Sequence, residues 1–293
     1  FVCLSYNNDD PDAVDNGYLH IFQSARDQTV FFDELSTLSN NVCLKLKALA
    51  LSDRFIIVGT NAAADRIGCR RFIPASDESS QPVTTTLFTG LGAVNAFEAC
   101  KVEGSDQFVV VANIAGTLII RRLDSKGVLQ NPSGGSYADI AANATHLTVY
   151  AHLSDDQICV GYEVAGVLRI QSYTLTTGAT LASAVTQLSG ITCAEISVLR
   201  VGNNLGGVVA SGTDASAEDS VYFGSFTTST GGSPTTVRAV VDATLTSTAL
   251  LQGGELVFGC RYGSVATKPA NASNVLVSAL AVGAETTSGR LQL

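Results

Sequence analysis

The strongest constraint on how this chain folds is a repeat of about 50 residues that recurs along its whole length. In the clearest copy, an apolar run, 108-FVVVAN, is followed after a small-residue turn by a second apolar run, 117-TLIIRRLD. The first run begins again every 48 to 54 residues, as 1-FVCLSY, 55-FIIVGT, 158-ICVGYE, 208-VVASGT and 256-LVFGCRY. Because one copy is too short to bury its own apolar side chains, the copies must pack against one another.

Each copy has the pattern of four short β-strands. The run 42-VCLKLKAL alternates apolar and other residues with a period of two, which is typical of a strand and not of a helix. Polar turns such as 104-GSDQ and 154-SDDQ separate the extended runs, and a weaker fourth run follows, as in 28-QTVFFDEL. No segment has the periodicity of an amphipathic helix. The sequence therefore predicts an all-β chain.

A unit of about 50 residues with four strands resembles the blade of a β-propeller, in which about 4–8 blades surround a central channel. The segment 108-FVVVANIAGTLIIRRLDSKG is similar to the F-V-V-x-W…R-F-D-x-x-G repeats of bacterial surface proteins, without their Trp. The motifs of WD40 repeats and of sialidases are missing, so the resemblance assigns no functional residue. We predict one domain over 1–293, a propeller of six four-stranded blades; a seven-bladed ring with one blade outside the chain is the alternative.

The approximate repeats are 1-41, 42-94, 95-145, 146-189, 190-243 and 244-293. The chain begins with the strand that is second in the other copies, so the first blade lacks its innermost strand. Three sources remain open for this strand: the C-terminal segment 286-TTSGRLQL, residues outside this sequence, or none.

The charge balance restricts the partners. The net charge is −9 and only 15% of residues are charged, whereas nucleic-acid binding relies on clustered Lys and Arg. No apolar run approaches the roughly 20 residues that cross a bilayer, so neither nucleic-acid binding nor membrane insertion is expected. The low charge and the absence of Met favour an extracellular, cell-surface or virion protein. The seven cysteines are spread singly, which favours buried thiols over a zinc site or a dense disulfide scaffold; one or two disulfides are the alternative.

Long loops mark the expected binding surface. The turns between second and third strands share one rim with the connections between blades, and insertions in repeat proteins gather on the binding face. On this rim the loops 7-NNDDPDAVDNG, 211-SGTDASAEDS and 262-YGSVATKPANAS are long. The predicted binding residues are Asp9, Asp10, Asp12, Asp15, Asp214, Glu218, Asp219, Tyr262 and Lys268.

The first loop could also bind a metal. Asp10, Asp12 and Asp15 offer carboxylate oxygens of the kind that Ca²⁺ prefers, although the spacing of an EF-hand is absent. The alternative is an acidic turn in solvent, because Asp and Asn are ordinary turn residues. No other cofactor is predicted. His146 and His152 lie about 20 Å apart on one expected strand, too far apart for one metal ion.

Two arginine pairs, Arg70–Arg71 and Arg121–Arg122, occupy matching places in consecutive copies. They could surround an anion, but adjacent strand residues point to opposite faces, so at most one of each pair can face one pocket. The alternative is pairing with carboxylates between blades or at the surface.

These observations favour a structural or protein-interaction propeller without enzymatic activity, a rigid module that binds the other protein subunits of a surface layer, filament or virion. The alternative is a lectin-like or Ca²⁺-dependent adhesive domain that uses the acidic loop and Tyr6, Tyr18 and Tyr262. A hydrolase with its site in the channel would need several acids on the innermost strands, where the sequence places only Glu98 and Glu195.

Overall fold

The structure is a computed structural model of the 293-residue chain. It describes residues 2–7, 16–25, 28–35, 46–60, 64–72, 85–89, 92–215, 219–232, 237–241, 243–250, 255–262, 275–281 and 290–292. Side chains are described only between residues 47 and 232.

All regular secondary structure in the described residues is β, as predicted. The strands, grouped by sheet, are β1 (Val2–Asn7), β2 (Asn16–Ala25) and β3 (Gln28–Leu35); β4 (Leu46–Ala50), β5 (Phe55–Thr60), β6 (Arg66–Phe72) and β7 (Thr85–Thr89); β8 (Val94–Glu103), β9 (Phe108–Ile114), β10 (Thr117–Leu123), β11 (Ile140–Ala141), β12 (His146–His152), β13 (Gln157–Val164), β14 (Val167–Thr174) and β15 (Thr180–Thr186); β16 (Thr192–Gly202), β17 (Leu205–Thr213), β18 (Asp219–Thr227) and β19 (Val237–Val241); and β20 (Ala243–Leu250), β21 (Glu255–Tyr262), β22 (Val275–Ala281) and β23 (Arg290–Gln292).

The repeating element is an antiparallel meander of consecutive strands. The sheets β4 to β7, β16 to β19 and β20 to β23 each contain one meander of four. The eight-stranded sheet contains two, joined where β8 and β12 run parallel and Ala151 lies opposite Val102. We call each meander a unit and name it after its first strand.

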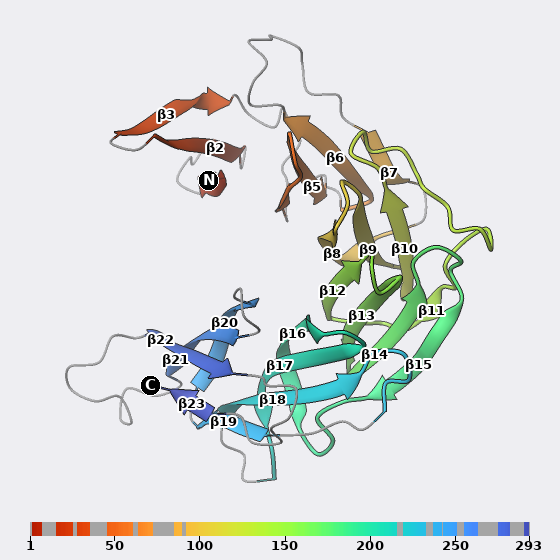
Figure 1. Cartoon of the computed structure of the whole chain (residues 1–293), viewed down its shortest axis with the longest axis vertical. Coiled ribbons are helices and arrows are strands. Elements are labelled where there is room, and N and C mark those ends of the chain that lie inside the picture. The colour runs from red at the N-terminus through yellow and green to blue at the C-terminus, as the bar shows by residue number, and fades with distance from the viewer. Residues whose placement is uncertain are drawn as a thin grey trace.

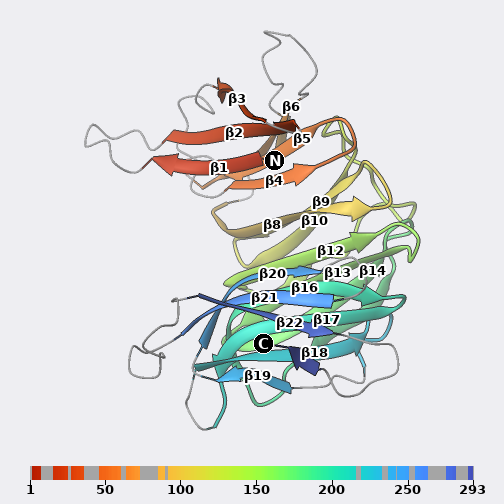
Figure 2. The ribbon, with the colours of Figure 1, turned by 60° about the vertical axis from the view of Figure 1, so that its left-hand side comes forward.

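The units follow one another in chain order around an arc, with β8, β12 and β16 on its concave side (Figure 1). The turned view in Figure 2 shows the same succession as a stack of sheets from β1 to β19. In the described strands, no pairing joins the first sheet to the last. The C-terminal strand β23 pairs with β22, where Leu280 lies opposite Leu291, so one suggested source of the missing innermost strand is wrong. The number of blades and the repeat boundaries stay predictions.

The second strand of a unit is covered on both faces. Every residue of β9 is buried, and its side chains alternate between two cores. Phe108, Val110 and Ala112 pack with residues of the β4 unit, whereas Val109 and Val111 pack with residues of the β12 unit. Burying one such side chain contributes about 1.5–3 kcal/mol. The consecutive apolar residues of the sequence therefore reflect contact with a neighbour on each side.

The shortest turns are tight hairpins. Between β9 and β10, Ala115 and Gly116 both have positive φ, 51° and 82°, and Ala165 and Gly166 repeat this between β13 and β14 with 52° and 79°. Two consecutive residues with positive φ are the signature of the type I′ turn, whose twist matches that of the two strands it joins. The second of these turns lies close to the next unit, where Cys193 N of β16 donates to the Gly166 carbonyl at 2.7 Å.

Candidate functional site

The two edges of the arc carry different connections. The turn rim holds the hairpins between first and second strands, such as 153–156 between β12 and β13. The loop rim holds the hairpins between second and third strands and the connections between units, such as 165–166 and 187–191. Both rims carry interacting polar side chains, described below.

Most of the predicted binding residues fall outside the described part of the chain. Asp9, Asp10, Asp12, Asp15, Glu218 and Lys268 are among these, so the acidic loop and its Ca²⁺ site stay predictions. Asp214 directly follows β17, Asp219 begins β18 and Tyr262 ends β21. All three therefore lie at loop-rim ends of strands, and their role in binding stays a prediction.

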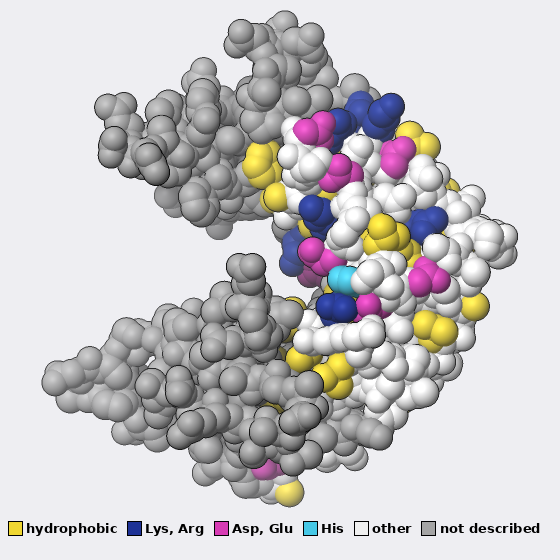
Figure 3. Space-filling model, in the orientation of Figure 1, with side chains coloured by type: hydrophobic (Ala, Val, Ile, Leu, Met, Phe, Trp, Pro, Cys, Tyr) yellow, Lys and Arg dark blue, Asp and Glu magenta, His cyan; other side chains and the backbone are white. Residues whose placement is uncertain are grey.

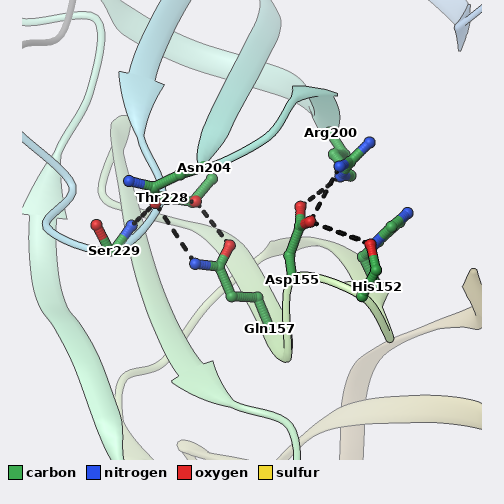
Figure 4. Close-up of polar contacts among 8 residues, drawn as sticks. His152, Asp155, Gln157, Arg200, Asn204, Thr228 and Ser229 are labelled. Atoms are coloured by element: carbon green, nitrogen blue, oxygen red, sulfur yellow. Dashed lines mark hydrogen bonds and ion pairs between the residues drawn. The ribbon is translucent and has the colours of Figure 1, made fainter.

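On the turn rim, a buried carboxylate joins two units (Figure 4). Asp155, in the β12–β13 turn, accepts hydrogen bonds from Nε and Nη2 of Arg200 in β16, at 2.5 and 3.0 Å. His152 Nδ1 lies 3.6 Å from the same carboxylate, whose side chain is only 7% exposed. The hydrogen bonds from Arg200 hold the pKa of Asp155 below its usual range. Such a charge-assisted, two-point contact fixes the orientation of both groups.

A second set of contacts on this rim surrounds Asn204 in the β16–β17 turn (Figure 4). Ser229 N donates to Asn204 Oδ1 at 2.9 Å, and Thr228 Oγ1 lies 2.8 Å from the same oxygen. Thr228 Oγ1 also donates to Oε1 of Gln157, in the preceding unit, at 2.7 Å. We call Asp155, Arg200, Gln157, Asn204 and Thr228 the turn clamp, because they join the β12 and β16 units through polar atoms.

The same device recurs earlier in the chain. Asp106, in the β8–β9 turn, accepts hydrogen bonds from Ser52 N at 2.9 Å and from Ser52 Oγ, in the β4–β5 turn of the preceding unit. Arg54 reaches the Ser125 carbonyl of the β8 unit at 3.4 Å. The recurring Ser, Asp and Asn that the sequence analysis interpreted as chain reversals therefore also connect one unit to the next.

On the loop rim, a histidine lies between two carboxylates from different units. His146, the first residue of β12, is directly opposite Glu163 of β13, and its Nδ1 is 3.3 Å from Glu163 Oε2. His146 Nε2 is 3.7 Å from Oε1 of Glu195 in β16. Thr145 Oγ1 donates to Glu163 Oε2 and lies 3.2 Å from His146 Nδ1. We call these four residues the acid–histidine cluster.

Glu163 is the buried member of the acid–histidine cluster. Its side chain is 6% exposed, against 37% for His146 and 58% for Glu195. Gly166 N, in the type I′ turn, donates to Glu163 Oε1. Burial raises the pKa of Glu163, but the hydrogen bonds from Thr145, Gly166 and His146 outweigh burial, and the net pKa is lowered. Glu163 is therefore an ionised carboxylate at neutral pH.

Glu195 reaches the cluster from a β-bulge. The pairing of β16 with β17 shifts between Cys193 and Ile196, and Glu195 N donates to Ser211 Oγ at 3.2 Å. A bulge re-aims the side chains of its strand and is frequent next to active sites. Sequence analysis selected Glu195 and His146 separately but missed Glu163, because that residue ends an apolar run whose cross-strand partner cannot be identified from spacing.

Glu98, the other acid predicted on an innermost strand, does not belong to this cluster. It lies on β8 and forms an ion pair with Lys47 of β4, with Lys47 Nζ 2.7 Å from Glu98 Oε1. Figure 3 shows basic and acidic side chains beside one another on one face of the described residues. Glu98 and Glu195 therefore have different partners and do not form one group of acids in the channel.

The arginines of the third copy contact neighbouring units. The Arg121 guanidinium carbon lies 5.6 Å from the centre of the Phe88 ring in β7, and Arg122 Nη1 donates to the Leu175 carbonyl at 2.8 Å. Adjacent strand residues thus reach opposite neighbours, as expected from their alternation. Their partners are a ring and a carbonyl, not the carboxylates that the sequence analysis suggested.

The four cysteines whose side chains the structure describes are free thiols. Cys69, Cys159 and Cys193 are buried and Cys100 is partly buried. Burial raises the pKa of Cys159 to about 12 and that of Cys193 to about 11, so both thiols stay protonated and unreactive. Within the described ranges, no three His, Cys, Asp or Glu side chains are arranged to hold a metal ion. In the same ranges, no helix has the length and hydropathy to cross a membrane.

Comparison with known proteins identifies a class of fold. No family model and no curated protein matches the sequence. A protein from Lactobacillus plantarum has a similar structure, with a TM-score of 0.57 and 11% identity over 99% of this chain and 80% of that one. The Dos1 propeller is similar with a TM-score of 0.52 and 12% identity, over 90% of this chain and 63% of that one. The chain therefore has an all-β fold of the propeller type.

The prediction that the protein is not an enzyme is contradicted, because enzymes are found among the proteins of similar structure. Similar structures include a GH43 β-1,3-galactosidase, with a TM-score of 0.45 and 11% identity over 80% of this chain and 55% of that one. A second GH43 glycoside hydrolase also matches. Enzymes thus occur among the similar structures, although likenesses of this size assign no activity to this chain.

Proposed function

We propose that this protein is a six-bladed propeller that serves as a rigid module of a larger assembly and binds a protein subunit with its loop rim. The turn clamp is the observation that supports this proposal. It connects consecutive units through Asp155 and Arg200, and through Gln157 and Thr228. A framework whose units are fixed at one rim can present loops at the other with little loss of entropy on binding.

The proposed partner surface is basic. The chain has a net charge of −9, and the loop rim carries the half-buried Asp214 and the exposed Glu195. Complementary charge on a partner would steer its association and fix its orientation. We place this assembly outside the cell, at a cell surface or in a virion, on the basis of the low charged fraction and the lack of Met.

Cross-linking of the protein in its native source tests this proposal. A carboxyl-reactive dihydrazide is applied without denaturation, and the products are analysed by mass spectrometry. We expect Asp214 or Glu195 to be linked to a residue of another subunit. No linkage to another subunit, or linkage only through turn-rim residues such as Asp53, would contradict the proposal.

A further inference from the structure

We propose that the acid–histidine cluster is a general acid–base site, in which His146 transfers the proton and Glu163 is the residue that positions it. This inference goes beyond the proposed assembly function and does not depend on it. It rests on the geometry of the two ring nitrogens and on the contrast with His152, the other histidine whose side chain is described.

The buried carboxylate determines where the imidazole carries its proton. Ionised Glu163 can only accept hydrogen bonds, and its Oε2 lies 3.3 Å from His146 Nδ1. Nδ1 must therefore carry a hydrogen, which leaves the lone pair of the neutral ring on Nε2. A carboxylate that holds one nitrogen of an imidazole in this way keeps the other nitrogen ready to accept a proton.

Nε2 of His146 faces Glu195, the most exposed residue of the three charged or titratable members of the cluster. His146 and Glu195 are 37% and 58% exposed, and Nε2 lies 3.7 Å from Glu195 Oε1. Two hydrogen-bond acceptors at this distance offer adjacent sites to a water or a substrate hydroxyl. Glu163 and Glu195 thus face the two ring nitrogens, one carboxylate each. In the described residues, these two carboxylates are the charged groups that face His146.

His152 also lies beside a carboxylate, but that carboxylate is paired with an arginine. Its Nδ1 lies 3.6 Å from Asp155, and that carboxylate already accepts two hydrogen bonds from Arg200. The Arg200 guanidinium neutralises the charge that would otherwise support an imidazolium. His152 is also less exposed, at 19%. It therefore serves as an internal control for any reactivity that a histidine next to a carboxylate would show by itself.

The chemistry that fits this site is hydrolysis of a neutral acyl substrate, because two carboxylates repel anions. Nε2 takes a proton from a water molecule while the water oxygen forms a bond to the acyl carbon. The carbon–oxygen bond to the leaving group then breaks, and the imidazolium returns the proton to the departing oxygen. The net reaction consumes one ester and one water and yields an acid and an alcohol, and the site ends in its starting state.

Hydrolysis of p-nitrophenyl acetate by the full chain tests the assignment. General-base catalysis is worth roughly 100-fold or more, so we expect His146→Gln to lower kcat/KM at least about tenfold. His152→Gln is the matched control and should retain the wild-type rate. Circular dichroism and thermal melting of both variants establish that they are folded.

Glu163→Gln tests the positioning role. Replacing the carboxylate with an amide removes the group that can only accept a hydrogen bond from Nδ1, so kcat should fall about tenfold while KM stays unchanged. A merely structural role would lower the melting temperature without changing kcat of the folded protein. The proposal is overturned if His146→Gln hydrolyses the ester at the wild-type rate, if His152→Gln loses as much activity as His146→Gln, or if folded Glu163→Gln keeps the wild-type kcat.

Discussion

At the scale of single residues, the turn clamp and the acid–histidine cluster each contain a carboxylate beside a histidine, but the two carboxylates have different partners. Asp155 and Glu163 are both nearly buried carboxylates next to a histidine. Asp155 is neutralised by Arg200 of the next unit, whereas Glu163 accepts uncharged donors from Thr145 and Gly166. The first arrangement holds units together, and the second leaves a net charge beside an accessible imidazole.

The lowered pKa of Asp155 predicts an acid-sensitive contact. Because the hydrogen bonds from Arg200 favour the ionised form, the contact stabilises the fold above the ordinary Asp range and is lost as pH falls below about 4. Asp155→Asn should lower the free energy of unfolding by about 1–3 kcal/mol at pH 7. It should also flatten the dependence of stability on pH in the acid range.

Urea denaturation between pH 3 and pH 7 measures both effects. Asp53→Asn is the control, since Asp53 pairs with the adjacent Arg54 at the surface and should leave stability unchanged. An Asp155→Asn variant with wild-type stability at pH 7 would show that the turn clamp does not hold the units.

At the scale of the elements, two units approach each other so closely at one glycine of β13 that no side chain fits there. A Cβ atom added to Gly161 in β13 would lie 2.4 Å from Val198 Cγ2 of β16 and 2.7 Å from Thr148 Cγ2 of β12. Val198 N also donates to Thr148 Oγ1 at 3.0 Å, which fixes β16 against β12. The glycine is thus required by the approach of the next unit, not by its own backbone conformation.

Gly161→Ala should therefore lower the free energy of unfolding by about 1–3 kcal/mol, because the added methyl group forces the units apart. Gly202→Ala is the matched control: its added Cβ would meet only Leu205, at an ordinary 3.7 Å. Thermal melting of the two variants makes the comparison. Equal melting temperatures would contradict the packing of β13 against β16.

At the scale of the whole molecule, the described middle strands are more deeply buried than the outer strand β15. The middle strands β9, β13 and β17 are buried along almost their entire length, whereas most residues of the outer strand β15 are exposed. The cores lie between units, so each middle strand is protected by its neighbours as well as by its own sheet. This arrangement predicts that local opening begins at the outer strands.

Hydrogen exchange followed by mass spectrometry tests this gradient. Backbone amides of β13 should exchange most slowly, and those of β15 should exchange at least about tenfold faster, because opening an outer strand exposes little apolar surface. Exchange of β15 at the rate of β13 would show that the eight-stranded sheet opens only as a whole.

The sequence by itself determined the class of fold and the position of most strands, because burial on two faces leaves consecutive apolar residues such as those of β9 and β13. It did not predict β11, whose two residues follow a long polar connection and carry little apolar signal. Only the tertiary structure decided that β23 pairs with β22, that Arg122 binds the Leu175 carbonyl, and that Glu163 and Glu195 meet at His146. These contacts join residues of different strands and units, and their distances depend on how the sheets twist and stack, which residue spacing along the chain does not encode.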